Sequence, residues 1–306
     1  MRPSYRSRLR RDFTQNRAIY FMVIPIVLFY ILFHYKTMYG TIIAFFNYRP
    51  AKGLKGSKFV GLDHFIYFFT SPFFWRTLRN TLAISVLSIL FGFTAPIILA
   101  LLLNEAKNTY FKKFIQTITY LPHFISTVII CGMLSSFCLT TGLFNDIIAF
   151  FGGDRISLLQ GTKYYRTVYI ASDIWQTVGW SSIIYLAALA GVDKTLYEVA
   201  QLDGANKWQQ ILHVTIPCLV PTIVIMFILK VGKMFDVGYE KIMLLYTPLT
   251  YERADVINTY VYRRGFAENV NFSYSTAVGF FNSVVCLILV FFTNKITRRL
   301  GGNSLW

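Results

Sequence analysis

The chain has 306 residues, of which 55% are hydrophobic and only 14% are charged, whereas a soluble domain carries about 25% charged residues. This composition, with a mean hydropathy of +0.49, excludes an ordinary water-soluble domain and indicates a membrane protein. The net charge of +16 does not indicate nucleic-acid binding, because the basic residues flank long apolar runs, as expected at cytoplasmic membrane boundaries.

Six apolar stretches are each long enough to cross a bilayer as a helix, which requires about 20 residues. They cover residues 18–40, 78–103, 114–139, 168–190, 216–235 and 273–293. We therefore predict an all-α polytopic membrane protein with six transmembrane helices. The first stretch is interpreted as a signal anchor, because it is long and no small-residue cleavage site follows it.

Six arginines lie within the first seventeen residues, ahead of the first apolar stretch. An excess of Lys and Arg marks the cytoplasmic side of a membrane, so both termini are expected in the cytoplasm. The connections 41–77, 140–167 and 236–272 then face outward, and 104–113 and 191–215 face inward.

The predicted organisation has four parts. They are a basic cytoplasmic segment (1–17), the first transmembrane helix (18–40), a transmembrane domain of five helices (76–293) that contains the inner loop 191–217, and a cytoplasmic tail (294–306). We find no internal repeat, which is evidence against folds built from inverted repeats.

The inner loop contains signals for a first short helix. Thr195 followed by Glu198 fits a capping box that opens the helix. The helix is expected to end near Asp203, because Gly204 suits the left-handed position that follows a helix. An ordinary connecting loop with good caps would explain the same residues.

A second helical stretch is predicted to begin at Ala205. It presents Trp208, Ile211 and Leu212 at the spacing of one helix face. Pro217 is expected in the first turn of the next transmembrane helix, where a missing N–H is tolerated. The two helices would form a bracket at the cytoplasmic surface of the membrane.

The bracket resembles the EAA loop of ABC-importer permeases. The resemblance rests on Glu198-Val199-Ala200, Asp203-Gly204-Ala205 and Ile216-Pro217, and Val199 departs from the alanine of the family pattern. In that family the loop docks in a cleft of a separate ATP-binding subunit. The resemblance implies the following docking residues: Glu198, Ala200, Asp203, Gly204, Ala205, Ile216 and Pro217.

Further segments resemble the type I, maltose-type carbohydrate permeases, in the branch that imports polysaccharides or oligosaccharides with a lipoprotein. These segments include 33–50, 60–65, 74–82, 95–105, 120–126, 179–193 and 255–265. The resemblance implies import of an oligosaccharide by alternating access at the cytoplasmic membrane of a Gram-positive bacterium. The implied partners are a second homologous permease, two ATP-binding subunits and an extracellular solute-binding lipoprotein.

No catalytic residue, bound cofactor or metal site is predicted in this chain. The glycines of 53–58 lack the spacing of a phosphate-binding loop, so ATP and Mg²⁺ are expected on the partner ATPase. The four histidines lie in separate regions, and no C-x-x-C pair occurs. Nucleic acid is not an expected partner.

Residues of the substrate pathway are harder to select from the sequence. Asp173 is the only acidic residue inside a predicted span, and such residues tend to mark pathways. Aromatic and amide side chains that suit a sugar ring add Trp175, Trp180 and Tyr185 on the fourth span and Asn282 on the sixth. An interfacial position for Asp173 and ordinary packing for the others are the alternatives.

Two other functions compete with import. A stand-alone secondary transporter should show an ion-coupling cluster or internal symmetry, and a membrane enzyme of polysaccharide metabolism should show paired acids near one membrane face. Neither pattern is evident in the sequence.

Overall fold

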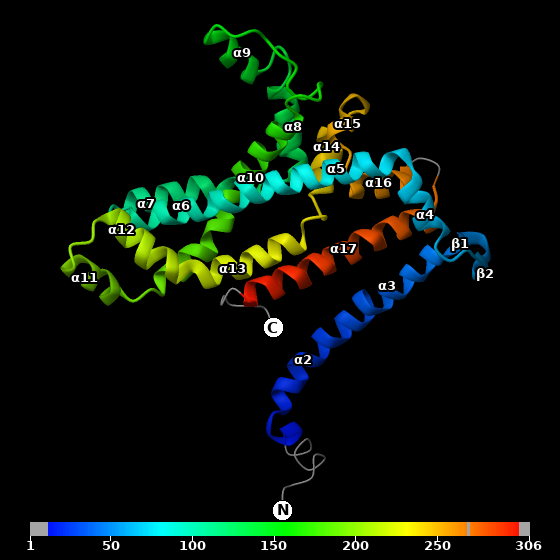
Figure 1. The fold of residues 1–306 in the computed structure, drawn as a ribbon, viewed down its shortest axis with the longest axis horizontal. Helices are drawn as coiled ribbons and strands as arrows, with labels where there is room; N and C mark the ends of the chain where they lie inside the picture. The colour runs from blue at the N-terminus through cyan, green and yellow to red at the C-terminus, as the bar shows by residue number, and fades with distance from the viewer. Residues whose placement is uncertain (1–11, 268–269, 300–306) are drawn as a thin grey trace, which may run out of the picture.

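The computed structural model describes residues 12–267 and 270–299 of the chain. Within them the secondary structure is helical, apart from one two-stranded hairpin (Figure 1). Most of the predicted basic segment 1–17 and the end of the predicted tail 294–306 lie outside the described residues.

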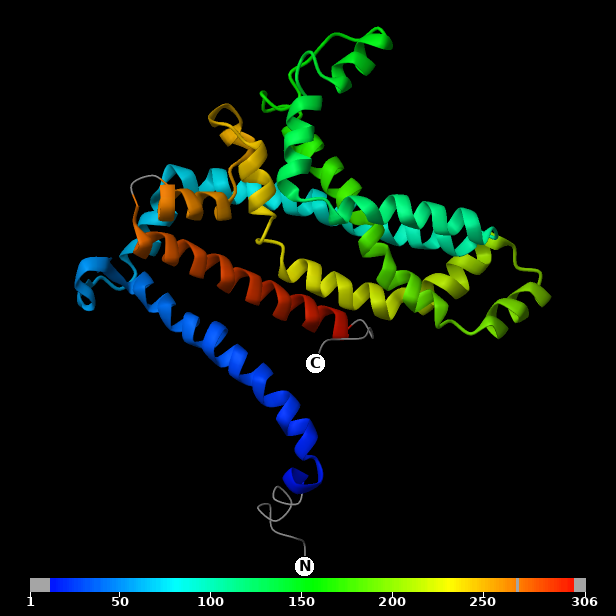
Figure 2. The ribbon, with the colours of Figure 1, turned by 180° about the vertical axis from the view of Figure 1, so that it is seen from behind.

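The N-terminal helix is long and continuous. Its consecutive parts are α2 (Arg17–Phe29), η1 (Tyr30–Tyr35), α3 (Lys36–Met38) and η2 (Tyr39–Phe45). Its most apolar stretch contains no buried residue, and its first half stands away from the other helices (Figure 2). Only the η2 end packs closely, against the C-terminal helix α17 (Phe272–Arg299).

A short hairpin follows and departs from the all-α prediction. Strand β1 (Phe46–Arg49) pairs antiparallel with β2 (Gly53–Phe59) around η3 (Pro50–Lys52). Gly53 has a φ of +63°, which a glycine adopts without strain at this turn. Tyr48 donates its backbone N–H to Ser273 Oγ at 2.8 Å, and this bond fixes the hairpin to α17.

The next helices build one wall of the body. They are α4 (Asp63–Thr70) and a 34-residue helix made of α5 (Pro72–Leu87), η4 (Ser88–Phe93) and α6 (Thr94–Glu105). The third predicted span is broken. It consists of α7 (Thr109–Tyr120), η5 (Leu121–Phe124) and α8 (Thr127–Phe137), and the two halves are bent by 98°. Pro122 lies in the first turn of η5, and a proline cannot donate the N–H that would continue a helix.

The central part of the chain contains α9 (Leu143–Phe150), α10 (Tyr165–Ala190) and α11 (Lys194–Leu202). It continues with α12 (Lys207–Gln210), η6 (Ile211–Thr215) and α13 (Ile216–Gly232), which form one 26-residue helix. Short elements then connect α13 to α17: α14 (Tyr239–Leu245), η7 (Pro248–Thr250), α15 (Tyr251–Ala254), α16 (Ile257–Tyr262) and η8 (Arg263–Ala267). Helices α13 and α17 lie side by side (Figures 1 and 2).

Four helices of the described chain are long and apolar enough to cross a membrane, and the bent α7–α8 pair is a fifth candidate. The four are Arg17–Phe45, Pro72–Glu105, Lys207–Gly232 and Phe272–Arg299. They coincide with four of the six predicted spans. Helix α10 covers the predicted span 168–190 and is long enough, but it is not among the helices that meet the apolarity criterion. The membrane prediction is therefore supported for four of the six predicted spans, or five if the bent pair is one span.

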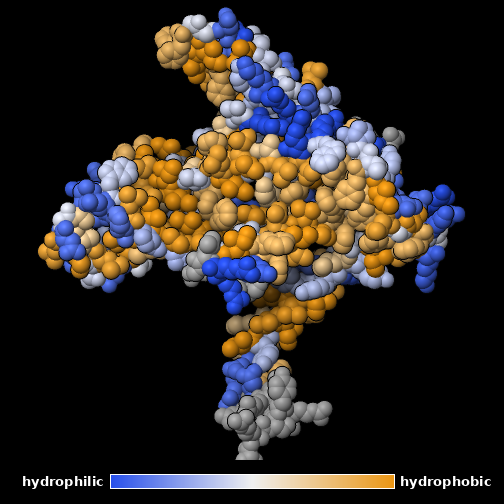
Figure 3. All heavy atoms as spheres, in the orientation of Figure 1, coloured by the Kyte–Doolittle hydropathy of each residue, from blue (hydrophilic) through white to orange (hydrophobic). Residues whose placement is uncertain are grey.

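The surface agrees with a membrane location. Apolar residues cover most of the visible face of the helical body, and hydrophilic residues gather around its border, at both ends and along parts of the upper and lower edges (Figure 3). A single-span anchor would not account for this, because the apolar surface extends over several helices.

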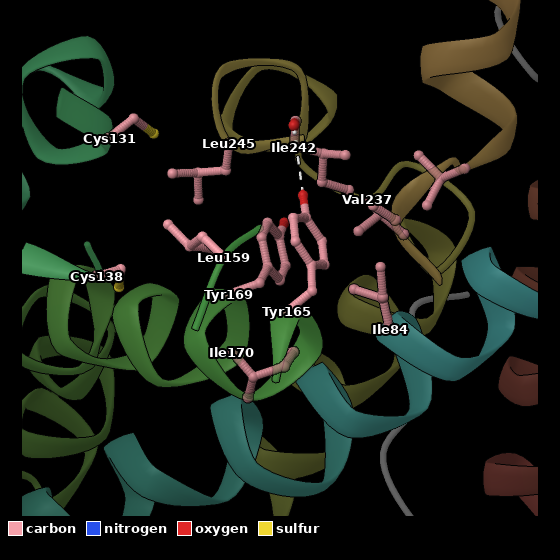
Figure 4. Close-up of a cluster of buried hydrophobic side chains, with 12 residues drawn as sticks. Ile84, Cys131, Cys138, Leu159, Tyr165, Tyr169, Ile170, Val237, Ile242 and Leu245 are labelled. Carbon is pink, nitrogen blue, oxygen red and sulfur yellow. Dashed lines mark hydrogen bonds between the residues drawn. The ribbon is translucent and has the colours of Figure 1, made fainter. Parts of the chain in front are cut away.

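The main core lies where α10 meets α14. Tyr165 and Tyr169 of α10 pack against Ile242 and Leu245 of α14, and all four side chains are buried (Figure 4). Tyr165 also donates its hydroxyl to the backbone carbonyl of Ile242 at 3.4 Å. Helix α14 is thereby held against the middle of the fold.

The segment between α14 and α17 is locked by a buried carboxylate. Asp255 Oδ2 accepts from Arg76 at 2.8 Å and from Arg263 at 2.7 Å, and Asp255 is fully buried. Asn80 of α5 donates to the backbone carbonyl of Asp255 at 3.0 Å. A buried carboxylate is tolerated only when it is paired and hydrogen-bonded in this way, so α5 and η8 are both held against the junction between α15 and α16.

Candidate functional site

The structure supports two functional regions, which we call the coupling segment (residues 191–217) and the central cavity. The coupling segment lies at one far end of the body, where α11 projects beyond the neighbouring helices (Figure 1). The central cavity lies between α10, the α7–α8 bend and the break between α13 and α14.

The first helix of the coupling segment starts two residues earlier than predicted. Asp193 is the N-cap of α11, and its side chain accepts from the Thr195 N–H at 2.9 Å. That bond holds the pKa of Asp193 below its usual value. The predicted capping box of Thr195 and Glu198 is therefore wrong, because Asp193, two residues before Thr195, is the N-cap and accepts from the Thr195 N–H.

The turn at Gly204 forms as predicted. Gly204 has a φ of +77° and donates its N–H to Gln201 O at 3.0 Å. Ala205 donates to Ala200 O at 2.9 Å. These two bonds form a Schellman motif, the usual way in which a helix ends on a glycine.

The second helix starts slightly later than predicted. Asn206 caps α12 with a capping box, in which Gln209 N donates to Asn206 Oδ1 at 3.0 Å and Asn206 N donates to Gln209 Oε1 at 2.7 Å. The helix then continues through Pro217 into α13 without a break. A π-helical stretch, η6, directly precedes α13. π-Helical turns within α-helices occur frequently at functional sites.

One contact joins the two helical parts of the coupling segment, and another attaches the segment to the body. Tyr197 OH lies 3.1 Å from Thr215 Oγ1, and Thr215 is buried. Lys207 forms an ion pair of 3.3 Å with Glu105 at the end of α6. The coupling segment is thus joined to α6 by this ion pair and to α13 by the helix that continues from α12.

The outer side of the coupling segment is apolar and exposed. Leu202 is 88% exposed and Trp208 is 74% exposed, on either side of the Gly204 turn. Leu196, Val199 and Leu212 are also exposed. Large apolar side chains grouped at one exposed tip are typical of a surface that binds another protein. Of the predicted docking residues, Glu198, Asp203 and Gly204 are exposed, and Ala200 and Ala205 are half-buried.

The central cavity has two adjoining chambers that share the wall formed by Tyr169, Asp173, Thr177 and Gly238. The larger chamber has a volume of about 540 Å³ and is bounded by the α7–α8 bend and the start of α14. The smaller chamber, about 310 Å³, is bounded by α5, η4 and the end of α13.

Interrupted helices border both chambers. Residues 233–238, between α13 and α14, are not helical, and they line the smaller chamber through Lys233, Met234, Asp236, Val237 and Gly238. The bend at His123–Thr127 lines the larger one. Non-helical backbone is tolerated at membrane depth where it lines a cavity, and transporters place substrate sites at such interruptions.

Asp173 lies in the shared wall beside a buried lysine. Its Oδ1 is 3.9 Å from Lys241 Nζ, and Lys241 also donates to Gln176 Oε1 at 3.2 Å. The Lys241 side chain is only 5% exposed, whereas that of Asp173 is 29% exposed. Burial lowers the pKa of Lys241, and the charge of Asp173 opposes that shift. Asp173 is thus a cavity residue with a charged partner.

The other pathway residues proposed from the sequence are dispersed. Trp180 stacks on His123 with ring centroids 4.6 Å apart and planes within 5°, so it supports the rim of the larger chamber. Trp175 lines a separate apolar cavity of about 650 Å³. Tyr185 is buried in an apolar cluster with Ala100 and Leu219.

Asn282 occupies a structural position rather than a chamber wall. It is buried, and its side chain donates to Phe235 O at 3.3 Å and to Asn258 Oδ1 at 3.1 Å. These bonds hold the non-helical segment 233–238 from behind. Of the five residues, Asp173 lines the central cavity and Trp180 stacks on His123, which lines the larger chamber, whereas Trp175, Tyr185 and Asn282 lie elsewhere.

Several residues of the cavity were not selected from the sequence. Lys230 and Lys233 lie at the end of an apolar run, and Lys241 and Gln176 belong to no motif, so none of the four was selected. Gly179 was also missed: a Cβ there would overlap the Thr119 carbonyl oxygen, so a glycine lets α10 approach α7. The sequence signal for this site was Gly232 between Lys230 and Lys233, where α13 ends.

Comparisons with known proteins agree with this arrangement. The family model described as "Binding-protein-dependent transport system inner membrane component" matches residues 92–302. The chain is 43% identical over 304 residues to the polygalacturonan/rhamnogalacturonan transport system permease protein YteP of Bacillus subtilis (strain 168), covering 98% of this chain and 94% of the relative. It is 40% identical over 304 residues to protein LplB of the same organism, covering 99% and 94%.

Solved structures give the same result. One chain in the crystal structure of a bacterial ABC transporter that imports the acidic polysaccharide alginate matches with a TM-score of 0.87 and 43% identity. The match covers 95% of this chain and 99% of that one. A second structure of the alginate transporter, in complex with an alginate pentasaccharide-bound periplasmic protein, matches with the same score and identity over 96% and 98% of the two chains.

Proposed function

The chain belongs to the family of binding-protein-dependent transport system inner membrane components, and on this premise we propose that it carries an oligosaccharide through the cytoplasmic membrane by alternating access. It is a permease subunit of an ABC importer and not an enzyme, as its similarity to YteP over 98% of its length indicates. The observation that carries the proposal is the polar cavity at the interrupted helices, within a chain of this family.

The oligosaccharide substrate is supported by the relatives. YteP is a polygalacturonan/rhamnogalacturonan permease, and the superposed transporter imports alginate. The cavity of this chain offers hydroxyl, amide and charged side chains together with the aromatic rings of His123 and Tyr169. That mixture suits a sugar, which has both hydroxyl groups and apolar ring faces.

Six transmembrane helices with both termini in the cytoplasm are part of the proposal. Helix α10 is the sixth transmembrane helix of the proposal. Its lower apolarity is explained by Asp173, Gln176 and Thr177, which line the cavity. Polar residues inside a membrane protein face the interior or a water-filled cavity. The Bacillus subtilis relatives support the cytoplasmic membrane of a Gram-positive bacterium as the location.

The proposed partners follow from two exposed regions. The apolar tip of the coupling segment would dock on an ATP-binding subunit, one of two that hold ATP and Mg²⁺. The outer connections 41–77 and 236–272 would receive a solute-binding lipoprotein, as supported by the complex of the alginate transporter with its periplasmic protein. A second, homologous permease would supply the other half of the pathway.

In the proposed cycle the loaded lipoprotein docks on the outer connections. ATP binding closes the ATPase subunits, and the coupling segment passes this movement to α6 and α13 through Lys207–Glu105 and Tyr197–Thr215. Because α13 ends at the cavity, its movement changes the side to which the cavity opens. A two-state change of this kind requires different contacts in each state.

The test is purification of the tagged chain from its native membrane in mild detergent, followed by mass spectrometry and reconstitution in liposomes. Co-purification of a second permease, an ATPase and a lipoprotein, with ATP-dependent oligosaccharide uptake, is the expected result. Isolation of the chain alone, with uptake that needs no ATP, would contradict the proposal and support a secondary transporter. Neither a secondary transporter nor a membrane enzyme of polysaccharide metabolism is favoured by the relatives.

A further inference from the structure

The smaller chamber of the central cavity contains two lysines with no carboxylate partner. Lys230 lies in the last turn of α13 and Lys233 directly follows that helix. The ion pairs found among residues 12–267 and 270–299 involve neither of them. Lys230 is half-buried, so its charge lies in a partly enclosed space.

The carboxylates of the same chamber are already engaged. Asp173 is paired with Lys241 at 3.9 Å. Asp236 Oδ1 accepts from Asn258 Nδ2 at 2.9 Å, and Asn258 is in turn held by Asn282 at 3.1 Å. The positive charge of Lys230 and Lys233 is therefore not cancelled by a direct ion pair.

The geometry of the helix end brings the two lysines together. Lys233 donates its backbone N–H to Lys230 O at 3.2 Å, so the two residues are neighbours at the end of α13, with Lys230 half-buried and Lys233 exposed. The chamber floor adds hydroxyl groups from Ser85, Ser88, Thr177 and Ser181. Two ammonium groups beside several hydroxyls can bind a ligand that carries both negative charge and hydroxyl groups.

We infer that Lys230 and Lys233 form a carboxylate-binding subsite, and that the permease prefers oligosaccharides containing uronic acids to neutral ones. The inference rests on the proposed function, because it names the substrate class of that cavity. An ammonium–carboxylate hydrogen bond is stronger than a neutral one and gains further strength where water is partly excluded. A neutral sugar would leave both ammonium groups without an anionic partner.

The test uses the whole transporter, reconstituted in liposomes with its second permease, its ATPase and saturating binding protein. The substrates are trigalacturonate and trimannuronate, which are acidic, and maltotriose and mannotriose, which are neutral. Uptake is measured for the wild type, for Lys230→Gln/Lys233→Gln and for Lys230→Arg/Lys233→Arg. Lys163→Gln is the matched control, because Lys163 is an exposed lysine outside both chambers.

The wild type should import an acidic trisaccharide in preference to the neutral ones. In the double glutamine variant, uptake of the acidic trisaccharides should fall about tenfold for each lysine replaced, as expected for loss of a hydrogen bond to a charged group. The double arginine variant and Lys163→Gln should retain it. ATP hydrolysis stimulated by the loaded binding protein should persist in all variants, because the substitutions lie outside the coupling segment.

The remaining outcomes separate the two claims. Unchanged acidic uptake in the double glutamine variant, or an equal loss in Lys163→Gln, would overturn the subsite. Import of neutral but not acidic trisaccharides by the wild type would overturn the substrate class and leave the importer function intact. Failure to import any of the four, without stimulated ATP hydrolysis, would overturn the proposed function itself.

Discussion

The coupling segment and the central cavity are specified by the sequence in different ways. In the coupling segment the decisive bonds join residues two to five positions apart, as between Asp193 and Thr195 or Ala200 and Ala205. In the central cavity Asp173 meets Lys241 from another helix, 68 positions away in the sequence. One region is local and exposed, and the other is assembled from distant elements and partly enclosed.

This difference explains what each region can do. The exposed coupling segment presents Leu202 and Trp208 outward, so it suits contact with another protein. The cavity presents charged and hydroxyl groups inward, so it suits a hydrophilic ligand. The long α12–α13 helix joins the two, because it begins in the coupling segment and ends at the cavity. Substitutions in the two regions should therefore have separable effects.

The largest effect is expected from Gly204→Asp. Aspartate at the left-handed φ of +77° is strained by about 1–2 kcal/mol, and its charge and bulk would disturb the docking tip. ATP-dependent uptake and stimulated ATP hydrolysis should both fall to background in reconstituted liposomes. Gly152→Asp is the matched control, because Gly152 also has a positive φ, +81°, and open space around it, but lies outside both regions. Equal defects in the two variants would show that strain alone, rather than coupling, is responsible.

A smaller effect, on stability, is expected from Gly179→Ala. The added methyl group would overlap the Thr119 carbonyl oxygen and push α10 and α7 apart. Overpacking of this kind costs about 1–3 kcal/mol, and thermal unfolding of the purified protein in detergent measures it. Gly132→Ala, in helix α8 with nothing nearby, should not destabilise the protein. A stable Gly179→Ala variant would show that α7 and α10 are less closely packed.

The Asp173–Lys241 pair gives the next prediction. Asp173→Asn leaves the buried ammonium group without its anionic partner, and the cost should be about 1–2 kcal/mol, reduced because Asp173 is partly exposed. Denaturant unfolding gives the free energy of unfolding of this variant, of Lys241→Gln and of the double variant, which together form a double-mutant cycle. Additive effects within error would show that the two groups do not interact.

The same lysine predicts a pH dependence of stability. Because burial lowers the pKa of Lys241, the folded state binds fewer protons than the unfolded state in the range just below the ordinary lysine pKa. Stability should therefore rise as the pH increases through that range. Lys241→Gln should remove this rise, and an unchanged pH profile would contradict the assignment.

The smallest effect is expected from Asp193→Ala in the coupling segment. Loss of the N-cap should shorten α11 at its exposed start and reduce stimulated ATP hydrolysis only partly, because the Schellman turn at Gly204 remains. Asp193→Asn should restore activity, since asparagine also caps helices. Thr195→Ala should have little effect, whereas a larger loss in Thr195→Ala than in Asp193→Ala would favour the capping box predicted from the sequence.

The sequence predicted the membrane class, the family and four of the spans, because each depends on local composition or on motif spacing. It also predicted the Gly204 turn, since only a few neighbouring residues determine it. The N-cap of α11 was misassigned because Asp193 and Thr195 are both good caps, and sequence alone does not select between them.

The cavity was predicted poorly for a physical reason. Lys230 and Lys233 at the end of an apolar run have the same pattern whether they reach to the membrane surface or line a chamber. Tyr185 and Asn282 fit a pathway by residue type, but packing places one in an apolar cluster and the other behind the α13–α14 break. Only the arrangement of distant helices distinguishes these cases.

The central claim is that the coupling segment docks on a separate ATP-binding subunit. The most direct test places a photo-crosslinking amino acid at Leu202, which is 88% exposed at the tip, and at Phe150 of α9, which is 85% exposed elsewhere. In native membranes, Leu202 should crosslink to an ATP-binding subunit, and Phe150 should not. Absence of that crosslink at Leu202, or an equal crosslink at Phe150, would contradict the account.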